Sequence, residues 1–192
     1  MWCRGSIPAL RRTGAQARTL GPGEVICHGD YGAWNTLWEG DDLVGVVDWD
    51  MAEPDRPIVD VAFLAIHAVP LRSDTKAREA GFLDVVPRGE RLRALCDAYG
   101  DVDPAAVLEA AAAFHVRDRR RTVEWGKECL EPWATFLARG ELATIEDDEA
   151  WLREHAQEIL DGSGEAEASA DIAAGRVTRF TTDQEFLASL DD

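Results

Sequence analysis

The sequence has very little lysine and no long hydrophobic run. Two of its 192 residues are lysines, Lys76 and Lys127, and the formal net charge at pH 7 is −17. No apolar stretch approaches the roughly 20 residues that a membrane-spanning helix needs, and the N-terminal residues lack the apolar core of a secretory signal. We therefore expect a soluble protein without a nucleic-acid or membrane partner, because phosphate backbones and anionic lipid surfaces repel an acidic protein.

Cysteine is also scarce, and its spacing excludes the common metal-binding and redox motifs. The four cysteines form no CxxC pair, so the pattern predicts reduced thiols and a cytoplasmic location. The acidic composition suits a cationic ligand, but a need for solubility explains it equally well, and the sequence leaves both explanations open. The cysteines are Cys3, Cys27, Cys96 and Cys129.

Glycine, proline and charge divide the chain into four predicted parts. Residues 1–23 form an irregular N-terminal arm, and residues 24–160 form the main body. Residues 161–170, DGSGEAEASA, have the composition of a flexible acidic linker. Residues 171–192 follow as a small strand-helix tail.

The main body begins with strand-like segments and continues with helical ones. Two apolar runs flank the turn Gly40–Asp42, which predicts a β-hairpin. A buried helix is expected just after Pro57, and a second helix should end at Gly100. Asp103 then has the position of an N-cap, and the helical pattern after it breaks near Pro132. We therefore expect an α+β fold that is mostly helical with a small β-hairpin.

The residues most capable of chemistry lie around this hairpin, in HGDYGAWN and VVDWD. Asp30 follows an apolar run, and Asn35 lies five residues later in the same loop. Asp48 ends the next apolar run, and strand alternation would place Asp48 and Asp50 on one face with Trp49 on the other. Oxygen ligands of this kind suit Mg²⁺ held against phosphate. A carboxylate that accepts a hydroxyl proton would complete a phosphoryl-transfer site.

HGDYGAWN followed by VVDWDMAEPDRPIVDVA resembles the catalytic core of the aminoglycoside phosphotransferase and choline kinase-like family. The resemblance implies a protein-kinase-like C-lobe that moves the terminal phosphate of ATP or GTP to a hydroxyl of a small molecule. Asp30 would then be the catalytic base, with His28 bracing the same catalytic loop. Asn35 and Asp48 would bind the Mg²⁺ of the nucleotide cofactor, and Asp60 would be a structural carboxylate at a helix start.

The same resemblance predicts parts that we do not find before the catalytic loop. The family places a glycine-rich turn and a strand lysine there to hold the nucleotide phosphates. The 27 residues before His28 include no lysine, and no GxGxxG or GxxxxGK[ST] motif occurs in the chain. We therefore expect a truncated phosphotransferase without its N-lobe, and leave open whether it is active alone. Its acceptor would be a small hydroxyl-bearing molecule, which the acidic composition suggests is cationic.

Two alternatives to a kinase remain. The C-terminal residues SADIAAGRVTRFTTDQEFLASLDD resemble the C-terminal ends of type II antitoxins of the Phd/YefM or RelB kinds, which implies a protein partner. The chain would then be a non-catalytic, kinase-derived interaction protein with a toxin-binding tail. A magnesium-dependent phosphohydrolase that uses the DWD pair ranks last, because no threonine follows Asp50 closely.

Other conspicuous side chains are expected to be structural. His67 and His115 should be packing or surface residues. Trp34, Trp38 and Trp49 are expected to pack in the core rather than to form a substrate cage.

Overall fold

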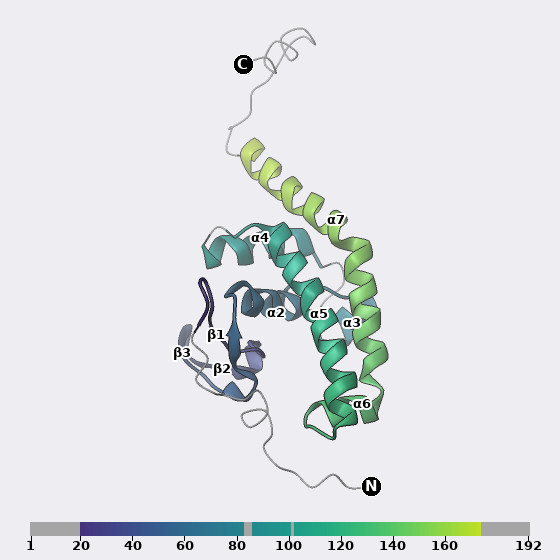
Figure 1. Ribbon diagram of the computed structural model, residues 1–192. Coiled ribbons are helices and arrows are strands. Elements are labelled where there is room, and N and C mark those ends of the chain that lie inside the picture. Colours follow the sequence, from purple (N-terminus) through teal and green to yellow (C-terminus); the bar gives the residue numbers. More distant parts are fainter. Residues whose placement is uncertain (1–19, 83–85, 101, 174–192) are drawn as a thin grey trace.

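The computed structural model describes residues 20–82, 86–100 and 102–173, with side chains up to residue 162. Within these residues helices make up most of the fold, and the short strands lie together on one side of them (Figure 1). The predicted α+β class, mostly helical with a small hairpin, is confirmed. No described helix is both long and apolar enough to cross a membrane.

In the described part of the chain, four short strands form two separate antiparallel pairs. The predicted hairpin consists of β2 (Thr36–Glu39) and β3 (Asp42–Val46), with Thr36 opposite Val46 and Glu39 opposite Asp42. β1 (Val25–Cys27) pairs with β4 (Glu53–Asp55), a pairing that the sequence did not predict. The catalytic loop leaves β1, and the DWD segment leads into β4. The β1–β4 pair therefore holds both ends of the candidate site together.

The helical expectations are largely confirmed. α2 begins directly after Pro57, α4 ends before Gly100, and the helical run breaks at Pro132 as predicted. Asp103 caps α5, because its carboxylate accepts a hydrogen bond of 2.9 Å from the amide of Ala105. A short helix capped by Ser73 was not predicted. The helices are α2 (Ile58–Ala68), α3 (Asp74–Glu79), α4 (Arg88–Tyr99), α5 (Pro104–Lys127), α6 (Trp133–Arg139) and α7 (Glu141–Ala173).

The predicted flexible linker over residues 161–170 is instead part of α7. Alanine and glutamate dominate the second half of this stretch, and both favour the helix enough to outweigh the cost of its two glycines. The first nineteen residues of the arm and residues 174–192 of the antitoxin-like tail lie outside the described residues. The division of the chain into domains stays a prediction.

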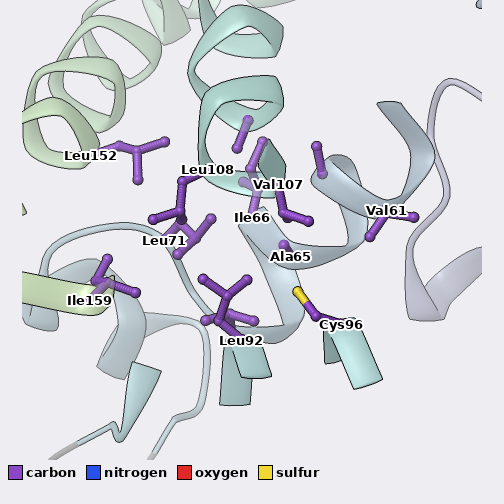
Figure 2. Close-up of a cluster of buried hydrophobic side chains, with 13 residues drawn as sticks. Val61, Ala65, Ile66, Leu71, Leu92, Cys96, Val107, Leu108, Leu152 and Ile159 are labelled. Atoms are coloured by element: carbon purple, nitrogen blue, oxygen red, sulfur yellow. The ribbon is translucent and has the colours of Figure 1, made fainter. Parts of the chain in front are cut away.

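The hydrophobic core lies between helices, away from the strands. α2 packs against α5, and α7 packs against both α4 and α5. Figure 2 shows the side chains that meet there, among them Leu71 and Leu92, which are fully buried, and Leu152, which is 1% exposed. Full burial of one such side chain contributes about 1.5–3 kcal/mol. α2 therefore has one face in this core while its first turn reaches the catalytic loop.

Candidate active site

The backbone of the catalytic loop is anchored by Asp60, in the first turn of α2. The amide of His28 donates to Oδ2 of Asp60 at 2.7 Å, and the amide of Gly29 donates to Oδ1 at 2.9 Å. One carboxylate thus accepts two consecutive backbone amides. This geometry agrees with the structural role that the resemblance implied for Asp60, and it ties the loop to a helix of the core.

Gly29 is required at its position by two constraints. Its φ of 80° lies in the left-handed region, where side chains cause strain. A Cβ atom there would also lie 2.4 Å from the backbone oxygen of Met51. The loop can therefore approach the DWD segment this closely only with glycine at position 29.

His28 connects the catalytic loop to the residue before Asp48. Its ring is 1% exposed, and Nε2 lies 2.8 Å from the carbonyl oxygen of Val47. Nδ1 accepts a hydrogen bond of 3.2 Å from the amide of Asp30, an arrangement that requires the proton of Nε2 to face the carbonyl of Val47. Because both ring nitrogens bind backbone, the geometry is that of a residue that braces the loop.

Asp30 and Asn35 are in direct contact, as their spacing suggested. The Asn35 side chain is 4% exposed, and its Nδ2 donates to the backbone oxygen of Asp30 at 2.8 Å and to Oδ2 at 3.1 Å. The backbone carbonyl oxygen of Asn35 accepts a hydrogen bond of 2.9 Å from the amide of Val47. Since Nδ2 is used by Asp30, Oδ1 of Asn35 is the atom available to a cation.

The carboxylate of Asp30 is partly withdrawn from water. Burial raises its pKa above the ordinary value, and the nearby carboxylate of Asp48 acts in the same direction. Hydrogen bonds from Trp34 and Asn35, together with an electrostatic interaction with His28, oppose the rise in the pKa. A carboxylate with a raised pKa is a stronger base, which suits the removal of a proton from a hydroxyl.

Asp48 does not end a strand as predicted. β3 ends at Val46, and Asp48 has φ 62° and ψ 60°, the left-handed conformation. Trp49–Met51 then form a 3₁₀ turn (η2), so strand alternation does not apply to Asp48 and Asp50. Both side chains are exposed. The predicted metal ligand Asp48 therefore lies on a tight turn beside the catalytic loop, and its own left-handed conformation changes the direction of the backbone there.

The donor set around this turn fits Mg²⁺ held together with substrate phosphates. Mg²⁺ is usually bound by one or two carboxylates, substrate oxygens and waters rather than by an all-protein cage. Asp48 supplies an exposed carboxylate and Asn35 an amide oxygen. In the described residues we find no cluster of three His, Cys, Asp or Glu side chains that could hold a metal without such help.

Two arginines that the sequence analysis missed fix the segment after Asp48. Arg121 of α5 donates to both carboxylate oxygens of Glu53, at 2.7 and 2.6 Å. Arg117 donates to Oδ2 of Asp55 at 2.6 Å. We call these four residues the α5–β4 clasp. The run RDRRR was visible in the sequence, but its partners lie more than 60 residues away, so no local pattern indicates them.

The tryptophan side chains near the loop are more exposed than predicted, whereas the two histidines behave as expected. Trp34 is 56% exposed, Trp38 57% and Trp49 50%, so the prediction that they pack in the core is wrong. His67 is half-buried and its ring lies edge-on to Trp34, with ring centres 4.8 Å apart. His115 is buried. Both histidines are packing residues, as expected.

Comparison with known proteins places the chain in a family. A model of the phosphotransferase enzyme family matches residues 6–105, which include the catalytic loop, the DWD turn and α2. The trifolitoxin immunity protein of Rhizobium leguminosarum bv. trifolii is 36% identical over 84 residues, which are 43% of this chain and 32% of that protein. The probable acyl-CoA dehydrogenase IBR3 of Arabidopsis thaliana is 31% identical over 122 residues, 59% of this chain and 14% of that protein.

The chain thus spans about a third of the first relative and about a seventh of the second. No solved structure matches at a significant level. The family match covers half of the chain and contains the catalytic loop, the DWD turn and Asp60, in agreement with the resemblance inferred from HGDYGAWN and DWD. The chain belongs to the phosphotransferase enzyme family.

Proposed function

We propose that this chain carries the acceptor side and the metal side of a phosphoryl-transfer site. The reaction would move the terminal phosphate of ATP or GTP to a hydroxyl of a small molecule. The observation that best supports this is the contact between Asp30 and Asn35, because it holds a partly buried base and an amide oxygen in one rigid loop. The hydrogen bonds to Val47 keep that loop beside Asp48.

In the proposed mechanism Asp30 orients the acceptor hydroxyl and accepts its proton as the hydroxyl oxygen attacks the terminal phosphorus of the nucleotide. The bond from that phosphorus to the bridging oxygen breaks, and ADP or GDP leaves. Asn35 and Asp48 would bind Mg²⁺, which neutralises charge on the donor phosphates. His28 and Asp60 hold the loop in place, so the base need not reorganise during the reaction. The acidic composition supports a cationic acceptor, whose amino groups would be attracted to the site.

The donor phosphates also need cationic residues, and three of those in the described part of the chain are engaged elsewhere. Lys76 lies 2.9 Å from Asp148 of α7, while Arg117 and Arg121 bind β4. We therefore propose that full activity requires a nucleotide-holding portion beyond the described residues, as the resemblance implied. The cytoplasmic location expected from the cysteines stays a proposal too.

Titration calorimetry with Mg²⁺–ATP and Mg²⁺–GTP tests the metal assignment. We expect the chain to bind the magnesium nucleotide weakly and Asp48→Asn to weaken this binding at least tenfold, because the exposed carboxylate is removed without changing the size of the side chain. Asp41→Asn, an exposed acid in the hairpin turn, is the matched control and should leave binding unchanged. Binding that Asp48→Asn leaves intact would contradict the assignment.

The alternative of a non-catalytic, toxin-binding protein has less support. It depends on a tail of which residues 174–192 are not described, and the names of the two relatives do not support it.

A further inference from the structure

Trp34 is a large aromatic side chain that stays exposed to water beside the candidate base. It belongs to the 3₁₀ turn η1 (Ala33–Asn35), and it is 56% exposed. Its indole Nε1 reaches Oδ2 of Asp30 at 3.5 Å. The acceptor of the proposed reaction has to approach this carboxylate. The indole therefore borders the space that the acceptor enters.

The indole rests directly on the backbone of Gly32. A Cβ atom at position 32 would lie 2.4 Å from Cζ2 of Trp34 and 2.5 Å from Cε2 and Cη2, which are all atoms of the six-membered ring. The backbone of Gly32 has φ −114° and ψ 167°, an extended conformation that any residue adopts. Glycine is therefore needed at position 32 for the placement of the indole, and not for the path of the backbone.

Two rings of α2 also contact the indole. The ring centres of Trp34 and His67 are 4.8 Å apart, and those of Trp34 and Phe63 are 6.0 Å apart, both in edge-to-face geometry. Phe63 is 8% exposed and packs in turn against Phe114 of α5, with ring centres 5.1 Å apart. Such aromatic pairs add stability beyond the area that they bury. The indole is thus joined to the helical core, and its exposed part is held in a fixed position.

The hydrogen bonds of Asp30 leave one carboxylate oxygen for the acceptor. Trp34 and Asn35 both donate to Oδ2, at 3.5 and 3.1 Å. In the part of the chain that the structure describes, we find no donor to Oδ1 of Asp30. Because the two oxygens share one carbon atom, a hydroxyl that binds Oδ1 brings the rest of its molecule close to the indole.

We propose that Trp34 is an acceptor-binding residue that favours hydroxyl compounds with a flat ring next to the reacting hydroxyl. The proposal rests on the proposed phosphoryl-transfer function for the role of Asp30, and it adds the surface that orients the acceptor. A rigid ring covers the indole with little loss of conformational freedom, whereas an open chain has to be ordered on binding. Tryptophan is also the aromatic side chain that best attracts a cation, so an amino group on the ring strengthens binding.

¹⁹F NMR of the full-length chain labelled with 5-fluorotryptophan tests the contact directly. The probes are trans-2-aminocyclohexanol and the open-chain 1-amino-2-hexanol, which each carry a secondary hydroxyl beside an amino group on the same number of carbon atoms. The resonance of Trp34 is the one that Trp34→Phe removes. Trp38, which is 57% exposed on β2, is the control, and Trp38→Phe assigns its resonance.

We expect the ring compound to shift the resonance of Trp34 and to leave that of Trp38 in place. The open-chain compound should bind about tenfold more weakly, because it loses more conformational freedom. A ring compound that shifts neither resonance, or shifts both equally, would overturn the proposal. Equal affinities of the two probes would overturn the preference for a ring.

Substitution of Gly32 tests whether the position of the indole matters. Gly32→Ala keeps Trp34 but displaces its ring, so it should weaken binding of the ring compound about tenfold, as Trp34→Ala should. The two changes together should cost no more than Trp34→Ala alone. Trp34→Phe should retain most of the affinity, and Trp38→Ala all of it. Effects of Gly32→Ala and Trp34→Ala that simply add would contradict the proposal.

These measurements also separate the role of Trp34 from the proposed function. Acceptor binding needs no nucleotide, so a chain that binds the ring compound through Trp34 but transfers no phosphate would support the binding role and contradict phosphoryl transfer. Conversely, magnesium–nucleotide binding that depends on Asp48, together with unchanged binding of the ring compound in Trp34→Ala, would overturn the role of Trp34 alone.

Discussion

At the scale of single residues, the loop is built so that Asp30 has one orientation. Its backbone amide donates to His28, and its carbonyl and carboxylate oxygens both accept from Asn35. The nearby Trp34 indole adds a weak contact at 3.5 Å. These contacts hold the carboxylate in a partly buried position, where burial raises its pKa. The same burial that strengthens the base makes its ionised form less stable.

Asp30→Asn should separate catalysis from stability. The substitution keeps the shape of the side chain but removes the base, so we expect phosphoryl transfer to fall by about 10²–10⁴-fold. The urea midpoint should stay the same or rise, because a partly buried charge is lost. ATP consumption with a panel of small hydroxyl compounds measures the first effect. Turnover that persists in the variant would exclude Asp30 as the base.

At the scale of secondary-structure elements, the α5–β4 clasp holds the strands to the helical core. The strands themselves are short, and two-stranded pairs are at best marginally stable alone. Arg121 and Glu53 are 17% and 21% exposed, so their ion pair is shielded from water more than a surface pair. The clasp thereby fixes β4, and through β4 the turn that carries Asp48.

Arg121→Met should destabilise the fold and weaken magnesium–nucleotide binding together. Removing the guanidinium leaves Glu53 partly buried without this partner, which costs about 1–3 kcal/mol. Arg139→Met is the control, because Arg139 is 70% exposed and lies 3.9 Å from Glu141, a contact worth about 0–1 kcal/mol. Urea unfolding and calorimetry measure the two effects. A double-mutant cycle of Arg121→Met and Glu53→Gln should show a coupling free energy between the two residues. If their effects on the unfolding free energy simply add, the proposed role of the clasp is contradicted.

At the scale of the whole molecule, stability changes with pH because burial makes several ionisable side chains resist ionisation in the folded state. Burial lowers the pKa of His67 from 6.5 to about 4, aided by the neighbouring charge of Arg72. Burial also lowers the pKa of His115, while it raises that of Asp118 from 3.8 to about 6. The histidines and Asp118 therefore have opposite effects on how stability changes below neutral pH.

His67→Gln should make the unfolding free energy less dependent on pH between about 4 and 6.5. In this window unfolded His67 binds a proton that the folded residue excludes, so its contribution to stability is lost as pH falls. Glutamine does not titrate, and its oxygen can still accept the hydrogen bond that Arg72 now donates to His67 at 3.2 Å. Urea unfolding at several pH values provides the measurement. Equal slopes in the two proteins would show that His67 is not kept neutral.

Much of the candidate site could be predicted from the sequence because its central contacts are local. Asp30 and Asn35 are five residues apart, and a loop of that length must keep them close. The helix starts at Pro57 and Asp103 were likewise predictable, because capping depends on adjacent residues. The hairpin followed from two apolar runs around one turn.

Other features depended on contacts that the sequence does not display. Lys76 binds Asp148, and Arg121 binds Glu53 68 residues away; only folding brings these partners together. The left-handed turn at Asp48 likewise departs from the strand alternation that the local pattern predicted. The local pattern alone thus determined which residues form the loop and its chemistry. Tertiary structure decided the position of Asp48 and how the strands are held, because these depend on long-range ion pairs and packing.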